Sequence, residues 1–369
     1  MDKHAEATIT NSIGENLDRL ITLDWRGQGH IQPLYNALRA KSSGPLTMHA
    51  AKCFVEKVKE GDTVFILTGF PVGPFDVFRD GKVAKEHTFS SDMVAPETDG
   101  VVAAALIARA VDLGFKGKPV ILCEAECVRI VEACCNTAGL RAFSDYKKSQ
   151  FMPHTVTVLP FTKDSLHAAD EARSLLDQFN PSAVVSIERP GANEKGAYHM
   201  ANGRSITDFV AKLDTVYDGV RERGGVAIGI GDLGNELGMG ALKEATRKII
   251  FYGERCRCGC GGGIGNVTKS NATIFGAVSE DASYAFLACL AYLQSNADLL
   301  QTAEMETRVL EAACNQGAID GPSGVTVPRI DYLDVQNHIH QIELMREIIQ
   351  APGRFFKLQP FFYGELISG

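Results

Sequence analysis

The stretch Thr63-Val-Phe-Ile-Leu-Thr68, between Gly61-Asp62 and Gly69-Phe-Pro71, has the pattern of a buried β-strand. Its apolar residues are continuous rather than alternating. A continuous apolar run is typical of a strand covered on both faces, as in a parallel sheet. Five similar runs follow along the chain, at residues 119–123, 155–159, 182–187, 225–230 and 272–278.

Segments with helical periodicity lie between these runs. In 100–113, Val102, Leu106 and Ala110 share one face, and Asp99 precedes the segment in a capping position. The other predicted helices are 124–138, 164–179, 206–223, 240–252, 284–293 and 333–350. This alternation predicts an α/β fold, with a mainly parallel or mixed sheet flanked by helices.

Composition narrows the classes of function. The 369 residues include 37 Lys and Arg against 45 Asp and Glu, a net charge of −8, so we expect no nucleic-acid partner. No run approaches the roughly 20 apolar residues of a membrane span, and the first 19 residues have four acids and no signal-peptide core. The ten scattered cysteines therefore predict reduced thiols and a cytoplasmic location.

Acidic residues collect where predicted strands end or helices begin. They are Glu97, Asp99, Glu124, Glu188, Asp232 and Glu236. Because ligands bind outside the carboxyl ends of parallel strands, these acids predict an acidic cavity there. Their mutual repulsion would cost several kcal/mol without a cation, and carboxylate oxygens suit Mg²⁺, Mn²⁺ or Ca²⁺. The alternative is that each acid caps a helix or faces solvent.

Two glycine-rich stretches carry weaker signals. Gly229-Ile-Gly-Asp-Leu-Gly234 matches G-x-G-x-x-G after a strand, but Asp232 would repel a pyrophosphate, so dinucleotide binding is disfavoured. Arg255-Cys-Arg-Cys-Gly-Cys260 offers three thiols for a soft metal, but a tetrahedral zinc site needs a fourth ligand and no histidine is nearby in the sequence. We interpret this stretch as a flexible loop with incidental thiols.

Several motifs occur in the order found in one family. They are Leu46-Thr-Met-His-Ala-Ala51, Pro96-Glu-Thr-Asp-Gly100, Ser186-Ile-Glu-Arg-Pro-Gly191 and Gly231-Asp-Leu-Gly-Asn-Glu-Leu-Gly-Met-Gly240. On these residues the chain resembles the D-glutamate cyclase-like family over about 28–350. The resemblance leaves 1–27 as an N-terminal extension and 351–369 as an aromatic tail. It implies an α/β domain with an acidic, metal-binding cavity, in a family described as converting D-glutamate to 5-oxo-D-proline with loss of water.

The resemblance and the strand-end pattern together assign roles. The predicted catalytic residues are Glu97, Glu236 and Arg189, the predicted substrate-binding residues are Thr98, Asn235 and Glu124, and the predicted metal ligands are Asp99, Glu188, Asp232 and Glu236. The chain departs from the family pattern at Leu233, where a glycine is usual, and at Asn271, where a strand aspartate is usual. The Ser-Asn-Trp-Gly sequence that follows this strand in relatives is also missing.

Three functions are compatible with this pattern. The first is a metal-dependent lyase that acts on a small acidic metabolite, as in D-glutamate cyclase. The second is a manganese-dependent phosphatase, in which two cations clamp a phosphomonoester. The third is a protein that binds metal or an acidic metabolite without catalysis, which the missing aspartate and Trp-Gly pair would explain. A homodimer is expected only because two-fold assemblies are common.

Overall fold

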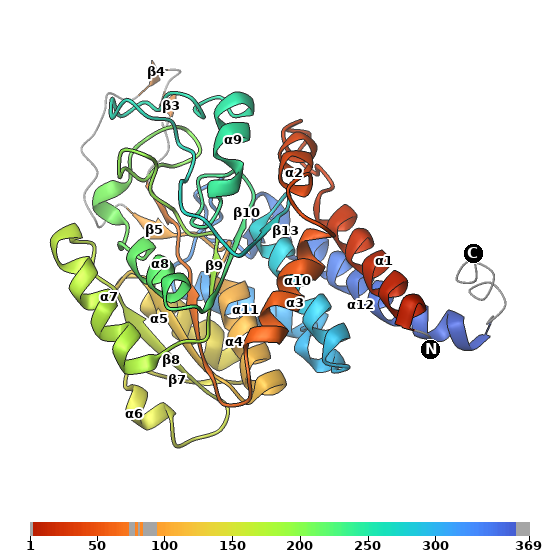
Figure 1. The fold of residues 1–369 in the computed structure, drawn as a ribbon. Helices are drawn as coiled ribbons and strands as arrows, with labels where there is room; N and C mark the ends of the chain where they lie inside the picture. The colour runs from red at the N-terminus through yellow and green to blue at the C-terminus, as the bar shows by residue number, and fades with distance from the viewer. Residues whose placement is uncertain (1–2, 74–77, 80–81, 84–93, 359–369) are drawn as a thin grey trace.

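The computed structural model describes residues 3–73, 78–79, 82–83 and 94–358 (Figure 1). Its centre is a parallel sheet of seven strands in the order β11-β10-β9-β1-β6-β8-β7. The strands are β1 (Thr63–Leu67), β6 (Lys118–Cys123), β7 (Arg141–Phe143), β8 (Thr155–Pro160), β9 (Ala183–Ile187), β10 (Val226–Gly231) and β11 (Ala272–Phe275). The predicted α/β fold with a mainly parallel sheet is confirmed, and the six predicted strands all belong to this sheet.

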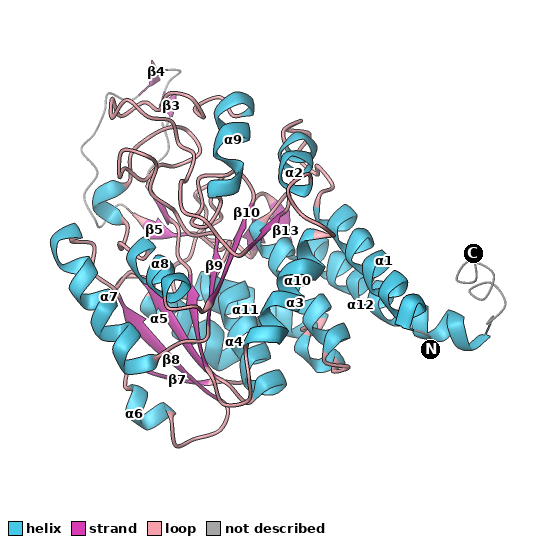
Figure 2. Cartoon of the chain, viewed as in Figure 1, coloured by secondary structure: helices cyan, strands magenta, loops and turns pink. Residues whose placement is uncertain are grey.

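Strand β1 lies in the middle of the sheet and explains why its sequence is apolar throughout. Val64 and Ile66 belong to one hydrophobic cluster, and Phe65 and Leu67 belong to the other. The two clusters lie on opposite faces because successive side chains of a strand point in opposite directions. Helices cover both faces, as Figure 2 shows.

Seven helices correspond to the predicted ones. They are α4 (Val101–Phe115), α5 (Val128–Thr137), α7 (Ser165–Phe179), α8 (Asp214–Glu222), α9 (Lys243–Ile249), α10 (Ser279–Leu293) and α12 (Val335–Leu358). The short turns η2 (Thr207–Phe209) and η3 (Gly240–Leu242) occupy the starts of the segments predicted for α8 and α9. The predicted cap on α4 is wrong, because Gly100 is the N-cap and the oxygens of Asp99 accept no hydrogen bond.

The sequence patterns did not predict the remaining elements. The helices are α1 (Lys3–Ile21), α2 (Ile31–Arg39), α3 (Leu46–Lys57), α6 (Tyr146–Ser149) and α11 (Ala303–Asn315), with the turn η4 (Ala297–Leu299). Three antiparallel pairs join β2 (Pro71–Val72) to β5 (Ala95–Pro96), β3 (Phe78–Arg79) to β4 (Lys82–Val83) and β12 (Arg329–Ile330) to β13 (Leu333–Asp334).

The two ends of the chain pack together. Helix α1 lies beside α3, α10 and α12 (Figure 1), and its Ile13 and Leu17 are buried in the larger core cluster. The described part of the predicted extension, residues 3–27, therefore contributes to the core. Most of the predicted aromatic tail, residues 359–369, lies outside the described part of the chain. No described helix is both long and apolar enough to cross a bilayer.

The order of the strands fixes where a ligand can bind. From β1 the chain moves outward to β6, whereas β9 pairs with the other edge of β1. Loops that leave the carboxyl ends of β1 and β9 therefore diverge and leave a crevice between them, which is the usual ligand position in open α/β sheets. The residues after β1, β9 and β10 surround this crevice.

Candidate functional site

A cavity of about 280 Å³ opens beside the carboxyl ends of the central strands. Its polar lining includes Arg26, Glu97, Glu188, Asp232, Asn235, Glu236 and Asp331. The structure thus brings four predicted acids and the predicted Asn235 to one hollow. It adds Arg26 and Asp331, which were not among the predicted site residues.

Three carboxylates in and beside the cavity are grouped tightly enough to share a cation. One oxygen from each of Asp99, Glu188 and Asp232 lies within 4.8 Å of the others, and all three residues are buried. Both oxygens of Asp99 are buried without a hydrogen-bond partner. Since a buried carboxylate normally has such partners, this donor set fits a hard divalent cation.

The carboxyl groups strongly influence one another's ionisation. Burial, followed by the charge of Asp331, raises the pKa of Glu97 and of Asp99 well above the usual range. Burial, followed by Asp232, raises the pKa of Glu188 in the same way. Burial and neighbouring acids raise the pKa of Asp232 and of Asp331 to about 7. Without a cation, several of these groups therefore hold protons at neutral pH.

Arg26 supplies positive charge to this acidic cavity. It donates to Asp331 at 2.6 Å and to the carbonyl oxygen of Ala277 at 2.7 Å, and it lies 3.5 Å from a carboxylate oxygen of Asp232. Its charge lowers the pKa of Asp232 and of Asp331 and so limits the rise that burial causes. Sequence reasoning missed Arg26 because the family resemblance was placed after residue 27.

Glu97 lies against the chain segment that carries Asp320 and Asp331. Its backbone forms a bridge with Ile319. A Cβ atom on Gly321 would lie 2.0 Å from the Glu97 carboxylate, so any larger residue here would displace the Glu97 side chain. Gly321 therefore packs against the Glu97 side chain, and Glu97, Gly321 and Asp331 all line the cavity.

Glu236 closes its own loop. Its carboxylate accepts hydrogen bonds from the backbone N–H groups of Asp232 at 3.2 Å, Leu233 at 2.8 Å and Gly234 at 2.7 Å. A Cβ on Gly231 would lie 2.7 Å from this carboxylate, and Gly234 has a φ of 102°. The G-x-G-x-x-G pattern thus receives an internal carboxylate where a phosphate would bind in a dinucleotide-binding loop, and the Glu236 side chain is engaged in these three backbone contacts.

Glu188 has a strained backbone directly after β9. Its φ is 37°, in the left-handed region, which costs a residue with a side chain about 1–3 kcal/mol. Gly100 packs against it, since a Cβ there would lie 2.9 Å from the Glu188 Cβ. The hydroxyl of Ser279 donates to one Glu188 oxygen. This conformation turns the Glu188 side chain toward the cavity.

Three predicted site residues have other contacts. The guanidinium of Arg189 is fully buried and donates to Glu124 at 2.5 Å and to the carbonyl oxygens of Gly69 and Ala211, both at 2.7 Å. The Thr98 hydroxyl donates to the carbonyl oxygen of Arg329 at 2.7 Å. None of the three lines the acidic cavity. Their geometry favours anchoring of the surrounding loops over contact with a substrate.

Asn235 connects the cavity to a neighbouring loop. Its side-chain nitrogen donates to the carbonyl oxygen of His199 at 3.0 Å, and its side-chain oxygen is buried without a partner. The residues that follow His199, namely Met200, Ala201 and Asn202, line the same cavity. Asn235 therefore fixes this wall and leaves one acceptor for a bound molecule.

Comparison with known proteins identifies the family of this chain. The family described as "D-glutamate cyclase-like, C-terminal" matches residues 17–346. Human mitochondrial D-glutamate cyclase is 37% identical over 111 residues, which are 30% of this chain and 17% of the human protein. The match to the family begins before Arg26 and ends after Asp331, so it includes every residue of the cavity described above. The chain belongs to the D-glutamate cyclase-like family.

Proposed function

We propose that this protein is a metal-dependent lyase that closes D-glutamate to 5-oxo-D-proline and releases one water molecule. The family and the name of the human relative support this reaction class. The observation that carries the proposal is the buried, unpartnered carboxylate of Asp99 beside Glu188 and Asp232. Such a group is expensive to keep in a fold unless a cation or a ligand compensates it.

Asp99, Glu188 and Asp232 would hold the divalent cation, for which we propose Mn²⁺ or Mg²⁺, with Ca²⁺ as a third candidate. When bound, this ion supplies positive charge that reduces repulsion of the substrate's γ-carboxylate and polarises it as a Lewis acid. Glu236 holds the loop that carries Asp232 and, through its three backbone hydrogen bonds, keeps that ligand in place.

The remaining cavity residues move protons. Ring closure forms a bond between the α-nitrogen and the carbon of the γ-carboxyl group and breaks one bond from that carbon to oxygen. Two protons move from nitrogen to the departing oxygen, which leaves as water. We assign Asp331, whose pKa is about 7, as the base that takes a proton from the α-ammonium group. Glu97, whose pKa burial raises strongly, stays protonated and donates to the departing oxygen.

The assay uses the full chain with D-glutamate and either Mn²⁺ or Mg²⁺, and it measures 5-oxo-D-proline on a chiral column. We expect product from wild type and at least about a 100-fold loss in Asp331→Asn and in Glu97→Gln, as for removal of an acid or a base. Glu60→Gln, which changes an exposed ion pair with Lys116, is the matched control and should retain full activity. Metal-loaded wild type that makes no lactam would refute the proposal.

The same protein preparation can test the two other functions. A phosphatase would release phosphate from phosphomonoesters. Against this function, the backbone amide groups after β10, which could bind a phosphate group, already bind the Glu236 carboxylate. A non-catalytic binding protein would be stabilised by metal without turnover. The Asn271 substitution gives this third function little support, because Asn271 lies at the amino end of β11, away from the acids, and accepts a bond from the Ala227 amide.

The partners and the location remain proposals. We propose a small acidic metabolite as the ligand, because Arg26 and a bound cation would attract one. A cytoplasmic location rests on the composition and on the ten free cysteines, whereas the human relative is named as mitochondrial. Gel filtration with light scattering would test the homodimer.

A further inference from the structure

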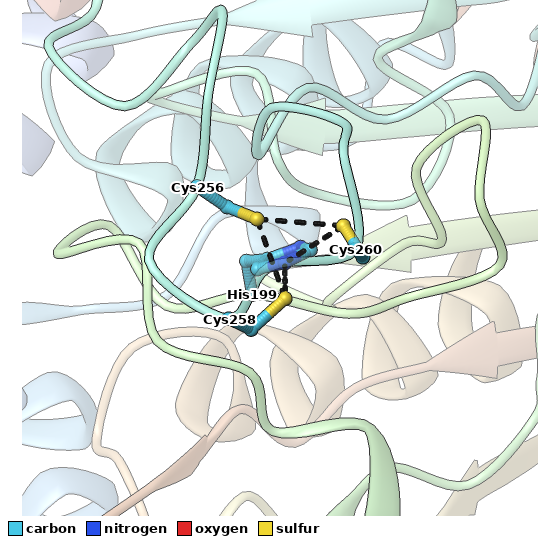
Figure 3. Close-up of side chains that lie close together, drawn as sticks. All are labelled: His199, Cys256, Cys258 and Cys260. Atoms are coloured by element: carbon cyan, nitrogen blue, oxygen red, sulfur yellow. Dashed lines mark hydrogen bonds between the residues drawn. The ribbon is translucent and has the colours of Figure 1, made fainter.

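A second group of metal-ligating side chains lies next to the acidic cavity. Cys256, Cys258 and Cys260 belong to the loop between α9 and β11, and His199 comes from the loop after β9 (Figure 3). One ligand atom from each of the four residues lies within 4.8 Å of the others. No histidine lies near these thiols in the sequence, but the fold brings His199 to them from 57 positions away.

The distances within this Cys/His cluster match a four-ligand site. Cys256 Sγ lies 3.3 Å from Cys258 Sγ and 3.4 Å from Cys260 Sγ. His199 Nε2 lies 3.2 Å from Cys258 Sγ and 3.9 Å from Cys260 Sγ. Zn–S bonds of about 2.3 Å at tetrahedral angles place two sulfurs about 3.8 Å apart, so a zinc ion needs only a slight expansion of the cluster.

The loop backbone is built to turn the thiols inward. Gly259 and Gly261 have φ angles of 78° and 82°, in the left-handed region that favours glycine. In an extended strand, side chains two positions apart would be separated by about 6.6 Å. The two glycines allow the backbone to turn, which lets the three sulfurs lie close together.

Polar groups around the cluster suit a bound thiolate. The backbone N–H of Gly262 donates to Cys260 Sγ at 3.4 Å, and Asn193 Nδ2 donates to the same sulfur at 3.5 Å. Hydrogen bonds of this kind orient metal-bound thiolates and stabilise their charge. His199 and Cys256 are buried. Cys260 thus already has two hydrogen-bond donors around its sulfur.

We propose that His199, Cys256, Cys258 and Cys260 bind one zinc ion as a structural Cys₃His site. Three thiolates and one imidazole are a complete tetrahedral ligand set, with no position left for water or substrate. Soft sulfur ligands select zinc over the hard cations that suit the carboxylates of the acidic cavity. Binding releases the thiol protons to solvent.

The zinc site holds one wall of the acidic cavity. His199 is followed by Met200, Ala201 and Asn202, which line that cavity. The backbone N–H of Arg257 donates to the carbonyl oxygen of Gly203 at 2.8 Å and ties the cysteine loop to the far end of the same wall. An effect of the zinc site on catalysis rests on the proposed function. Zinc binding itself does not depend on the proposed function.

The decisive measurement uses the full wild-type chain, purified in reducing buffer from cells supplied with zinc. We expect about one zinc per chain by elemental analysis and, after Co²⁺ exchange, the absorption of a tetrahedral cobalt–thiolate centre. Wild type without zinc, iron in place of zinc, or a disulfide among the three cysteines would each overturn the proposal.

Variants separate this site from the acidic cavity. Cys258→Ser and His199→Asn should bind zinc at least about 10-fold more weakly, whereas Cys53→Ser, which changes a thiol 3.8 Å from His49, should keep it. Asp99→Asn should lose lactam formation but retain zinc. If Cys258→Ser and His199→Asn both keep wild-type zinc, the ligand assignment is wrong, whatever the outcome of the cyclase assay.

Discussion

The charge of Asp232 offers the sharpest test of the cavity's electrostatics. In metal-free protein, the environment raises the pKa of this carboxyl group from 3.8 to about 7. The folded state therefore binds a proton more tightly than the unfolded state, and the stability that wild type has at low pH falls as pH rises from about 4 to 7. Asp232→Asn removes the titration and should be the more stable protein above pH 7.

The magnitude follows from the size of the pKa change. At 1.36 kcal/mol for each tenfold change in proton affinity, the difference corresponds to about 4 kcal/mol above pH 7. Loss of the attraction to Arg26, 3.5 Å away, reduces this gain, so we expect about 1–4 kcal/mol at pH 8. The gain should shrink toward zero near pH 4, because Asp232 is neutral in the folded state there and its carboxyl group, with a pKa of 3.8, is only partly ionised in the unfolded state.

Urea denaturation would measure this gain as a difference in the free energy of unfolding. The protein is dialysed to remove metal and unfolded at pH 4.5 and at pH 8. Asp18→Asn is the control, because Asp18 is also buried but accepts hydrogen bonds from Leu46, Thr47 and Tyr35. We expect this control to lose about 2 kcal/mol or more. If Asp232→Asn is less stable than wild type at pH 8, the cavity does not carry uncompensated charge.

Three further outcomes follow from the structure. Gly321→Ala places a Cβ 2.0 Å from the Glu97 carboxylate, so lactam formation should fall at least about 10-fold while the circular dichroism spectrum stays unchanged. Arg189→Met leaves Glu124 buried without its cation and should cost about 3–5 kcal/mol in urea denaturation. The pKa values of Asp331 and Asp232 are both about 7. The affinity for Mn²⁺, measured by calorimetry, should therefore be higher at pH 8 than at pH 6, and binding should release protons.

The sequence was sufficient to predict six of the seven strands of the sheet, all but β7, and much of the acidic cavity. Apolar runs such as Thr63–Leu67 identify buried parallel strands without further information. Because the carboxyl ends of parallel strands lie at the same edge of a sheet, Glu188 after β9 and Asp232 after β10 had to lie at that edge. The inference depended on the direction of the strands and not on their order.

Contacts made across long sequence distances were not predictable in this way. Nothing in the residues around Arg26 indicates that it meets Asp331, and nothing around His199 indicates that it meets Cys256, because each pair is joined by the packing of whole segments. Arg189 was misjudged for a different reason. Its positive charge suggested that it binds a substrate carboxylate, but its guanidinium group already forms a buried ion pair with Glu124.

The ion pair between Arg26 and Asp331 spans 305 positions of the chain. A fragment cut to residues 28–350 would contain the seven strands and the clustered acids, yet it would lose the guanidinium that offsets them and the helix α1, which packs on α3, α10 and α12. Such a fragment would open the cavity to solvent on one side. Anyone who shortens this protein for crystallisation should therefore retain the first 27 residues, because the N-terminal segment completes the acidic cavity.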